Sequence, residues 1–428
     1  MSVSIANAKA QSDKPPRYLM QAKQGQTRQR ISQRHAGWLV LFSTLALLAV
    51  GVTSIELANE MSGVSVNYAK KQLIIAGMGL VIAFFCTIPH YKWLAYFRWP
   101  LAAITLIPLI FVLLPFVPES IVTPRNGARR WINLGLMDVQ PSELVKVTYV
   151  AIMAGYLRYR DTYRRFSGLF MPAFIAFVPM SLILVEPDLG TSLLFIPALV
   201  AMLIAAGAKL SHLITTGSLA FLFAVVVIAI SLVAAERGDY PLLREHQVER
   251  IQTVVGPYLG IDSDEQGRDF QASRAKTLIG AGGTVGHAPT KAAAFVHFSR
   301  LPERHNDMIF PVIVARWGFV GAVGVIGLYV LWVGGALLVA ASCKVAFGRI
   351  LVVGLATMVG TQAFINIGMT LGLLPITGMT LPFVSAGGSS LLAGFMMVGL
   401  IMNVAMRRPP YLWRPSFEYD GDDGAAVE

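Results

Sequence analysis

Long apolar stretches recur along the chain, and short polar segments separate most of them. A helix needs about 20 residues to cross the ~30 Å hydrocarbon core of a bilayer. Ten stretches approach or exceed that length: 37–55, 73–90, 99–117, 141–157, 169–185, 189–207, 212–234, 308–341, 350–372 and 387–406. The hydrophilic segment 235–307 is much longer than the other connections. The pattern predicts an all-α polytopic membrane protein with about ten transmembrane helices and one large loop between helices 7 and 8.

Composition agrees with this pattern and supplies an orientation. The chain is 55% hydrophobic and 14% charged, with a mean hydropathy of +0.61, which excludes a soluble globule of 428 residues. Its net charge of +11 comes largely from short loops and the N-terminal segment rather than from a basic stripe on a soluble domain, so nucleic acid is not the expected partner. Because short basic loops mark the cytoplasmic side, we expect both termini to be cytoplasmic and the loop 235–307 to be extracytoplasmic.

Three regions follow from these observations. Residues 1–35 are polar and basic and are predicted to form a disordered cytoplasmic tail. Residues 36–407 form the membrane domain, and residues 408–428 form a second cytoplasmic tail.

One short loop on the predicted outer side carries cations against the usual bias. Arg125, Arg129 and Arg130 lie in P-R-N-G-A-R-R-W-I-N-L-G (124–135). The planar fork of donors on arginine suits phosphate, so the loop could bind an anionic ligand. Contact with lipid headgroups explains the arginines equally well.

Ionisable residues also occur inside or at the ends of predicted spans. In Q-P-S-E-L-V-K (140–146), Glu143 and Lys146 lie on one helix face. They could form an ion pair that fixes helix packing, or Lys146 could contribute positive charge to a polar cavity. Because charges at this depth are costly, the functional interpretation is slightly favoured. In V-E-P-D-L-G-T (185–191), the default role of Asp188 is to cap the next helix, and orientation of a cation is the alternative.

The end of the long outer segment carries the carboxylate best placed for chemistry. The run P-E-R-H-N-D-M-I-F (302–310) places Asp307 at the water–membrane boundary beside Arg304 and His305. Such a group could accept a proton, although an ordinary helix start is the simpler explanation. The glycines of I-G-A-G-G-T-V-G (279–286) are interpreted as a flexible, substrate-facing loop, and Arg316 is expected ~13 Å deeper than Asp307 along a helix.

Five ordered blocks together resemble the SEDS family of bacterial cell-wall proteins, which includes RodA, FtsW and SpoVE. They are N-G-A-R-R-W-I-N-L-G with Q-P-S-E-L-V-K; E-P-D-L-G-T-S; I-G-A-G-G-T-V-G; L-P-E-R-H-N-D-M-I-F; and N-I-G-M-T-L-G-L-L-P-I-T-G with L-P-F-V-S-A-G-G-S-S. The resemblance covers residues 37–406. The L-P-E-R-H run and the N-I-G-M block resemble the elongation branch, RodA, slightly more than the division branch.

The resemblance implies a peptidoglycan glycosyltransferase that polymerises lipid II in the bacterial cytoplasmic membrane, during elongation or division, with a class B penicillin-binding protein as partner. It implies that Asp307 is the catalytic base. A divalent cation (Mg or Mn) is a possible cofactor. Our candidates for substrate-binding residues are Arg125, Arg129, Arg130, Glu143, Lys146, Asp188, Arg304 and His305. A lipid II flippase and a non-catalytic scaffold for the transpeptidase remain as alternatives.

The chain departs from the family pattern at several positions near these blocks. Asn306 and Met308 replace the usual Thr and Phe beside Asp307, and Ala386 replaces a usual Tyr. Ala315 and Arg316 stand where many members have two acidic residues. These last changes put the efficiency of polymerisation in question.

Overall fold

The computed structural model of the protein describes residues 17–60, 67–125, 128–133, 135, 138–159, 162–235 and 268–407. The first half contains α2 (Arg17–Asn59), α3 (Tyr68–Thr87), α4 (Lys92–Tyr96), α5 (Arg98–Leu113), α6 (Pro141–Arg158), α7 (Phe170–Val185), α8 (Leu189–Leu193), α9 (Phe195–Ala206) and α10 (Leu210–Ala235). The second half contains α12 (Arg268–Ala281), α13 (Pro289–Phe298), α14 (Ile309–Ser342), α15 (Ala346–Thr370) and α16 (Gly388–Met406).

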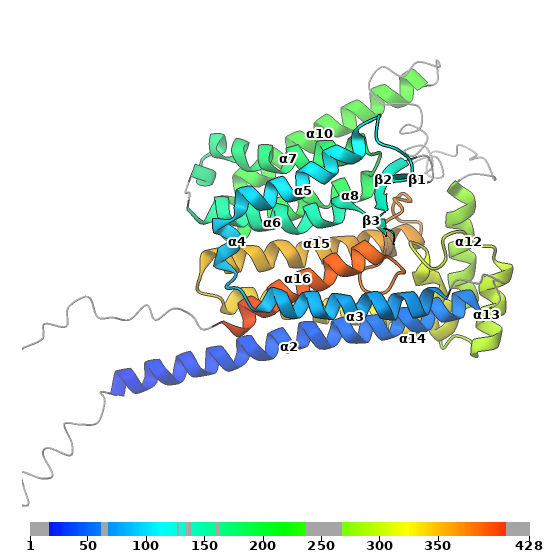
Figure 1. The fold of residues 1–428 in the computed structure, drawn as a ribbon, viewed down its shortest axis with the longest axis horizontal. Helices are drawn as coiled ribbons and strands as arrows, with labels where there is room; N and C mark the ends of the chain where they lie inside the picture. The colour runs from blue at the N-terminus through cyan, green and yellow to red at the C-terminus, as the bar shows by residue number, and fades with distance from the viewer. Residues whose placement is uncertain are drawn as a thin grey trace, which may run out of the picture.

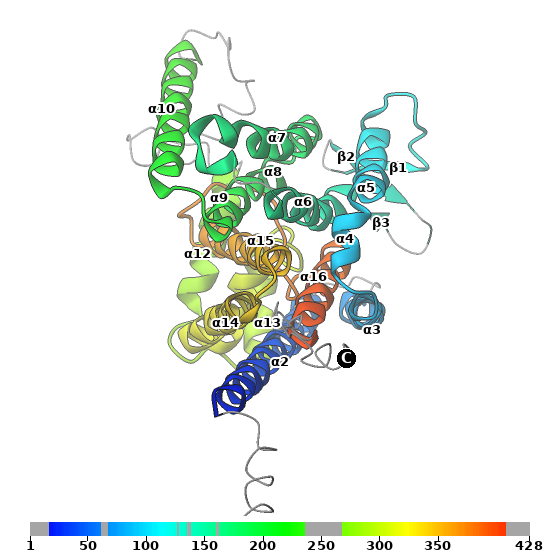
Figure 2. The ribbon, with the colours of Figure 1, turned by 90° about the vertical axis from the view of Figure 1, so that its left-hand side faces the viewer.

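The long helices form a bundle whose axes run in roughly the same direction (Figure 1). Seen along these axes, α15 and α16 lie centrally, with α2, α3 and α14 on one side and α5, α6, α7, α9 and α10 on the other (Figure 2). Each of the ten predicted stretches coincides with helix, and seven helical segments among the described residues are long and apolar enough to cross a membrane. The polytopic all-helical prediction is therefore confirmed, whereas the number ten stays a prediction.

The N-terminal helix corrects the predicted tail. Residues 17–35 belong to α2, so the expectation of disorder up to residue 35 is wrong for them. Gln, Lys, Arg and Met favour helix, and the apolar span that follows supplies the costly nucleus from which the helix extends. At 43 residues, α2 is about 65 Å long and projects beyond the bundle (Figure 1). Residues 1–16 and 408–428 lie outside the described ranges.

A small antiparallel sheet at the opposite end of the bundle was not predicted. Its strands, in the order β1-β2-β3, are β1 (Val122–Arg125), β2 (Ala128–Asn133) and β3 (Asp138–Val139). Ser389, in the first turn of α16, donates to the carbonyl of Asp138 at 2.9 Å and so connects the sheet to the bundle. The helices α12 and α13 lie at this same end (Figure 1), which we call the sheet end.

A break at Gly318 divides α14 into two unlike parts. Gly318 has φ 65° and ψ −160°, a conformation that L side chains rarely adopt. Residues 309–315 before the break are all buried, whereas Phe319 and Val320 directly after it are 65% and 63% exposed. Residues 319–342 alone extend about 36 Å, enough to span the hydrocarbon core. The segment that follows Asp307 is therefore a short helix enclosed by protein.

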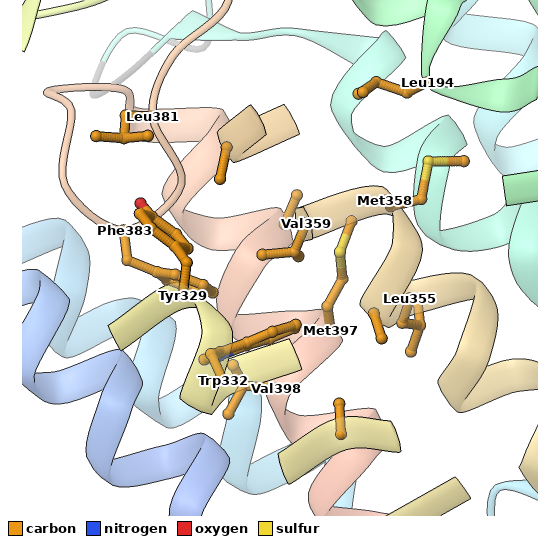
Figure 3. Close-up of a cluster of buried hydrophobic side chains, with 14 of the residues drawn as sticks. Leu194, Tyr329, Trp332, Leu355, Met358, Val359, Leu381, Phe383, Met397 and Val398 are labelled. Carbon is orange, nitrogen blue, oxygen red and sulfur yellow. The ribbon is translucent and has the colours of Figure 1, made fainter. Parts of the chain in front are cut away.

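One cluster of the apolar core lies between α14, α15 and α16 (Figure 3), and the core continues into α2, α3, α6 and α9. Trp332 of α14 is fully buried, and its indole N–H donates to the hydroxyl of Thr44 in α2 at 2.8 Å. Phe383 packs against Trp332 from the segment between α15 and α16. This packing fixes the segment that faces the candidate site described next.

Candidate active site

Asp307 lies in the turn immediately before α14, at the sheet end of the bundle. Its side chain is only 7% exposed, and its Oδ1 has no hydrogen-bond partner. Burial, helped by the nearby Glu303 carboxylate and opposed by backbone amides at Asp307 and Met308, raises the pKa of Asp307 to about 7. A carboxyl group that ionises near neutral pH and has a free oxygen is suited to accept a proton.

Hydrogen bonds from two other parts of the chain hold the backbone at Asp307. The side-chain amide of Asn366, in α15, donates to the Asp307 carbonyl at 2.8 Å. The hydroxyl of Ser385, between α15 and α16, donates to the carbonyl of Asn306. The position of the carboxyl group thus depends on α15 and on the segment that follows it.

The two predicted neighbours of Asp307 lie on the same turn. The main-chain carbonyl of His305 accepts a hydrogen bond from the Ala386 amide at 2.8 Å. The imidazole ring of His305 stacks on the ring of Tyr68, with centroids 4.4 Å apart. Burial lowers the pKa of His305, which favours the neutral imidazole at neutral pH. Arg304 is partly exposed beside it.

Unusual backbone conformations surround this turn. Among the described residues other than glycine, four have positive φ: Arg300 (47°), Glu303 (47°), Phe383 (67°) and Pro187 (34°). The first three belong to the segment that leads to Asp307 or to the segment packed against it. Such conformations cost of the order of 1–3 kcal/mol each and persist where the surroundings enforce them, commonly at functional sites.

Lys146 and Glu143 form a closed pair in the interior. Lys146 is 1% exposed, and its Nζ lies 2.8 Å from Glu143 Oε2. The same ammonium donates to Gln362 Oε1, in α15, at 2.9 Å. The ion pair expected from the i, i+3 spacing is therefore present, and it is completed by a neutral amide from another helix.

The Lys146 pair and Asp307 lie beside the same face of α15. Gln362 contacts Lys146, and Asn366 contacts Asp307. Residues four apart lie one above the other on a helix, about 6 Å along its axis. Each of the two amides therefore holds one of the two predicted parts of the site.

Asp188 acts as a helix cap, as its default interpretation predicted. Its Oδ1 accepts from the Thr191 amide at 3.1 Å, and its Oδ2 accepts from the Thr191 hydroxyl at 2.9 Å and from Gln140 Nε2 at 3.0 Å. Both oxygens are thus engaged by the protein. Across the described ranges, no three or more His, Cys, Asp or Glu side chains gather into a group that could hold a metal ion. The divalent cation named as a possible cofactor stays a prediction.

Arg130 connects the sheet to the turn between α7 and α8. Its Nε donates to the Glu186 carbonyl at 2.6 Å, and its Nη2 donates to the Pro187 carbonyl at 2.5 Å. The Glu186 side chain is 1% exposed, with no partner for either carboxyl oxygen. Burial, together with the Asp188 carboxylate and against the opposing charge of Arg130, raises the pKa of Glu186 to about 8. No sequence motif indicated a role for this second buried carboxyl group.

Arg129 is likewise committed to backbone contacts. It donates to the carbonyl of Val117 and, at 3.4 Å, to that of Pro115, both just beyond the end of α5. The side chain of Arg125 is outside the part of the chain that the structure describes. Arg129 and Arg130, the two predicted anion-binding arginines whose side chains are described, therefore also hold backbone segments together at the sheet end.

The backbone of the glycine-rich loop is hydrogen-bonded to α14 at its break, and its predicted role in facing the substrate stays a prediction. The Phe319 amide donates to the Gly283 carbonyl at 2.9 Å, and a Cβ at Gly286 would lie 2.3 Å from the Arg316 carbonyl oxygen. The Arg316 side chain donates to the His287 carbonyl at 2.9 Å. Arg316 therefore fastens this loop to the short helix that follows Asp307. Its depth relative to Asp307 stays a prediction.

Comparison with known proteins agrees with the blocks that carried the resemblance. The sequence model of the FtsW/RodA/SpoVE family, described as cell cycle protein, matches residues 34–409. The chain belongs to this family. Similar curated proteins include the probable peptidoglycan glycosyltransferase FtsW of Coxiella burnetii, 30% identical over 89% of this chain and 98% of that protein. The stage V sporulation protein E of Bacillus subtilis is 30% identical over 86% of this chain and 96% of that protein.

Solved structures show the same fold for this SEDS chain. One, described as a peptidoglycan synthase complex that coordinates polymerization and crosslinking, has a TM-score of 0.70 and 30% identity over 87% of this chain and 98% of that chain. The rod shape determining protein RodA of Thermus thermophilus has a TM-score of 0.61 and 26% identity over 87% and 97% of the two chains. Relatives carry names from the division, sporulation and elongation branches, so the slight preference for RodA stays a prediction.

Proposed function

We propose that this SEDS protein is a peptidoglycan glycosyltransferase that polymerises lipid II. The observation that carries the proposal is the largely buried Asp307 carboxyl group. One of its oxygens has no hydrogen-bond partner and its pKa is about 7, both of which suit a base. The names of its relatives, which include several probable peptidoglycan glycosyltransferases, support the same activity.

In the proposed reaction, Asp307 takes the proton from the 4-hydroxyl of the acceptor N-acetylglucosamine. The freed oxygen attacks C1 of the donor's N-acetylmuramic acid, and the bond from C1 to undecaprenyl pyrophosphate breaks with inversion at C1. His305 and Arg304 would line the acceptor side, since they share the turn with Asp307. A base placed within hydrogen-bond reach typically contributes 10²–10⁴-fold to such a rate.

The leaving pyrophosphate requires positive charge on the donor side. Arg125, Arg129 and Arg130 are our candidates for direct contact, and the partly exposed Arg130 is placed between the sheet and the α7–α8 turn. Lys146 is too deeply buried to contact the substrate in this conformation and would stabilise the leaving group through long-range electrostatic attraction. Glu143 would hold the ammonium in place, and Asp188 would shape the turn between α7 and α8. No step passes through a metal ion.

We further propose that the sheet end faces the outside of the bacterial cytoplasmic membrane and that both termini are cytoplasmic, as the short basic loops indicate. A class B penicillin-binding protein would be the partner, because one structural neighbour is a complex that coordinates polymerization with crosslinking. Cell elongation is the process favoured by the L-P-E-R-H and N-I-G-M blocks, with cell division as the alternative.

The test is polymerisation of purified lipid II by the chain, alone and with its transpeptidase partner, followed by separation of the glycan strands on a gel. Wild type should make polymer, and Asp307→Asn should lose at least 100-fold of the rate. Glu119→Gln, which alters an exposed carboxylate, is the matched control. Polymer from Asp307→Asn at the wild-type rate would overturn the mechanism. Movement of lipid II across vesicles without polymer would instead support the transporter alternative.

A further inference from the structure

Two buried amides on α15 each make one contact with the candidate site and one with the same short piece of backbone. Gln362 is 5% exposed and Asn366 is fully buried. Gln362 accepts from Lys146 at 2.9 Å and donates to the Thr380 carbonyl at 2.9 Å. Asn366 donates to the Asp307 carbonyl at 2.8 Å and to the carbonyl of Met379, the residue before Thr380, at 2.6 Å.

We propose that Gln362 and Asn366 are positioning residues that set the separation between the Lys146 ammonium and the Asp307 carboxyl group by fastening both to residues 379–380. The inference rests on the proposed glycosyltransferase reaction, in which the base and the positive charge act on opposite sides of the same sugar bond. Neither residue would touch the substrate.

The need for such a device follows from how the two charged groups are attached. Asp307 lies in a series of turns, 302–308, rather than in a regular element that would fix its place. Lys146 is on a helix, but its long side chain has many rotamers, and all but one must be suppressed to fix the ammonium. Catalytic groups must be held to within ~0.5 Å, which requires supporting contacts that are themselves rigid.

The shared backbone is rigid for reasons independent of the two amides. The Thr380 hydroxyl donates to Ser390 Oγ at 3.0 Å, and the Leu381 amide donates to Ser385 Oγ at 2.8 Å. The buried Tyr329 hydroxyl donates to the Pro382 carbonyl. Because Ser385 also holds Asn306, a displacement of this segment would carry the base and the ammonium together.

The chain provides a matched control at the other end of the bundle. Asn403 in α16 is 1% exposed, and its amide donates to the carbonyls of Cys86 at 2.7 Å and Pro89 at 2.5 Å. Asn366→Leu and Asn403→Leu therefore remove the same kind of two-carbonyl contact, once beside the site and once far from it. Their difference separates positioning from stability.

The experiment measures polymerisation of lipid II by the full chain with its partner, as a function of pH, together with the midpoint of thermal unfolding. Asn366→Leu should lower kcat at least tenfold and displace the acidic limb of the pH profile, because the backbone that carries Asp307 is released. Asn403→Leu should lower the unfolding midpoint by a similar amount but leave the pH profile unchanged. Equal activity losses with unmoved profiles in both variants would overturn the proposal.

Gln362 provides a second arm. Gln362→Glu keeps an acceptor for Lys146 but has no donor for Thr380, whereas Gln362→Met loses both bonds. Both variants should lower kcat, because either change frees the ammonium from the shared backbone. Gln362→Glu with wild-type kinetics would contradict the role of residues 379–380.

A third readout does not depend on activity. The infrared band of the protonated Asp307 carboxyl, identified by its loss in Asp307→Asn, can be titrated in each variant. Asn366→Leu should shift its midpoint, and Asn403→Leu should not. If wild type makes no polymer but this shift is seen, the proposed function fails while the positioning contact stands; an unshifted band refutes the positioning by Asn366 even when polymer is made.

Discussion

The Lys146 pair and Asp307 are both buried, charged parts of one candidate site, yet their surroundings differ. The Lys146 ammonium has a carboxylate and an amide oxygen within 2.9 Å, whereas Asp307 Oδ1 has no partner. A buried charge with hydrogen-bonding partners helps to define the packing around it. A buried carboxyl oxygen without a partner carries an uncompensated desolvation cost, which a hydrogen bond from a substrate hydroxyl could relieve. Of the two, Asp307 has a carboxyl oxygen without a hydrogen-bond partner, and the Lys146 pair is closed.

The largest effect on stability should come from breaking the closed pair. Lys146→Met leaves Glu143 buried without its cation, which typically costs about 3–5 kcal/mol of unfolding free energy. Combining it with Glu143→Gln should recover much of this loss, because no uncompensated charge remains. Chemical unfolding in detergent measures both, and a double variant no more stable than Lys146→Met would show that the pair is not coupled.

Removing the unpaired charge should have the opposite sign. The folded-state pKa of Asp307, about 7, lies above its ordinary value of 3.8, so the native state retains a proton that the unfolded chain releases. The contribution of Asp307 to stability is therefore full below about pH 4 and is lost as pH rises through about 7. Asp307→Asn should be more stable than wild type at pH 8, by roughly 2–4 kcal/mol.

The advantage of Asp307→Asn should shrink as the pH falls towards 4, since the wild-type carboxyl group is then neutral as well. Thermal unfolding over this pH series provides the measurement. An advantage that does not change with pH would mean that packing, not ionisation, separates the two proteins.

The same pKa predicts the pH dependence of the proposed activity. The rate should fall about tenfold for each pH unit below 7, because only the ionised Asp307 can accept a proton. Glu303 raises this pKa through its charge, so Glu303→Gln should move the acidic limb to lower pH by a fraction of a unit. Initial rates between pH 5 and 9 test this, and a limb that moves upwards would contradict the assignment.

The smallest effect is expected at Arg316, which contacts the glycine-rich loop rather than either charged group. Arg316→Gln removes its hydrogen bond to the His287 carbonyl and should cost about 1 kcal/mol. Hydrogen exchange at residues 282–287 should accelerate, while the pH profile of polymerisation stays that of wild type. A displaced pH profile would show instead that Arg316 influences Asp307 electrostatically.

The sequence contained the parts of this site but not their arrangement. Apolar run lengths predicted the helical positions, and the i, i+3 spacing of Glu143 and Lys146 predicted their pairing, because both depend on local geometry. The contacts of Gln362 and Asn366 with residues 379–380 depend on how a turn folds back onto α15, which no local pattern specifies. The break in α14 at Gly318 was not predicted, because a glycine within an apolar span does not by itself specify a break.

The break in α14 has a consequence for how the protein is made. Residues 309–342 form a single apolar run, longer than one membrane crossing requires. In our orientation, residues 282–286 must already have been translocated before they can bind residues 314–320 and stabilise the break. Asp307 would therefore reach its final depth only after the preceding loop has left the insertion machinery. A newly inserted chain would therefore stay inactive until residues 282–286 have folded against α14.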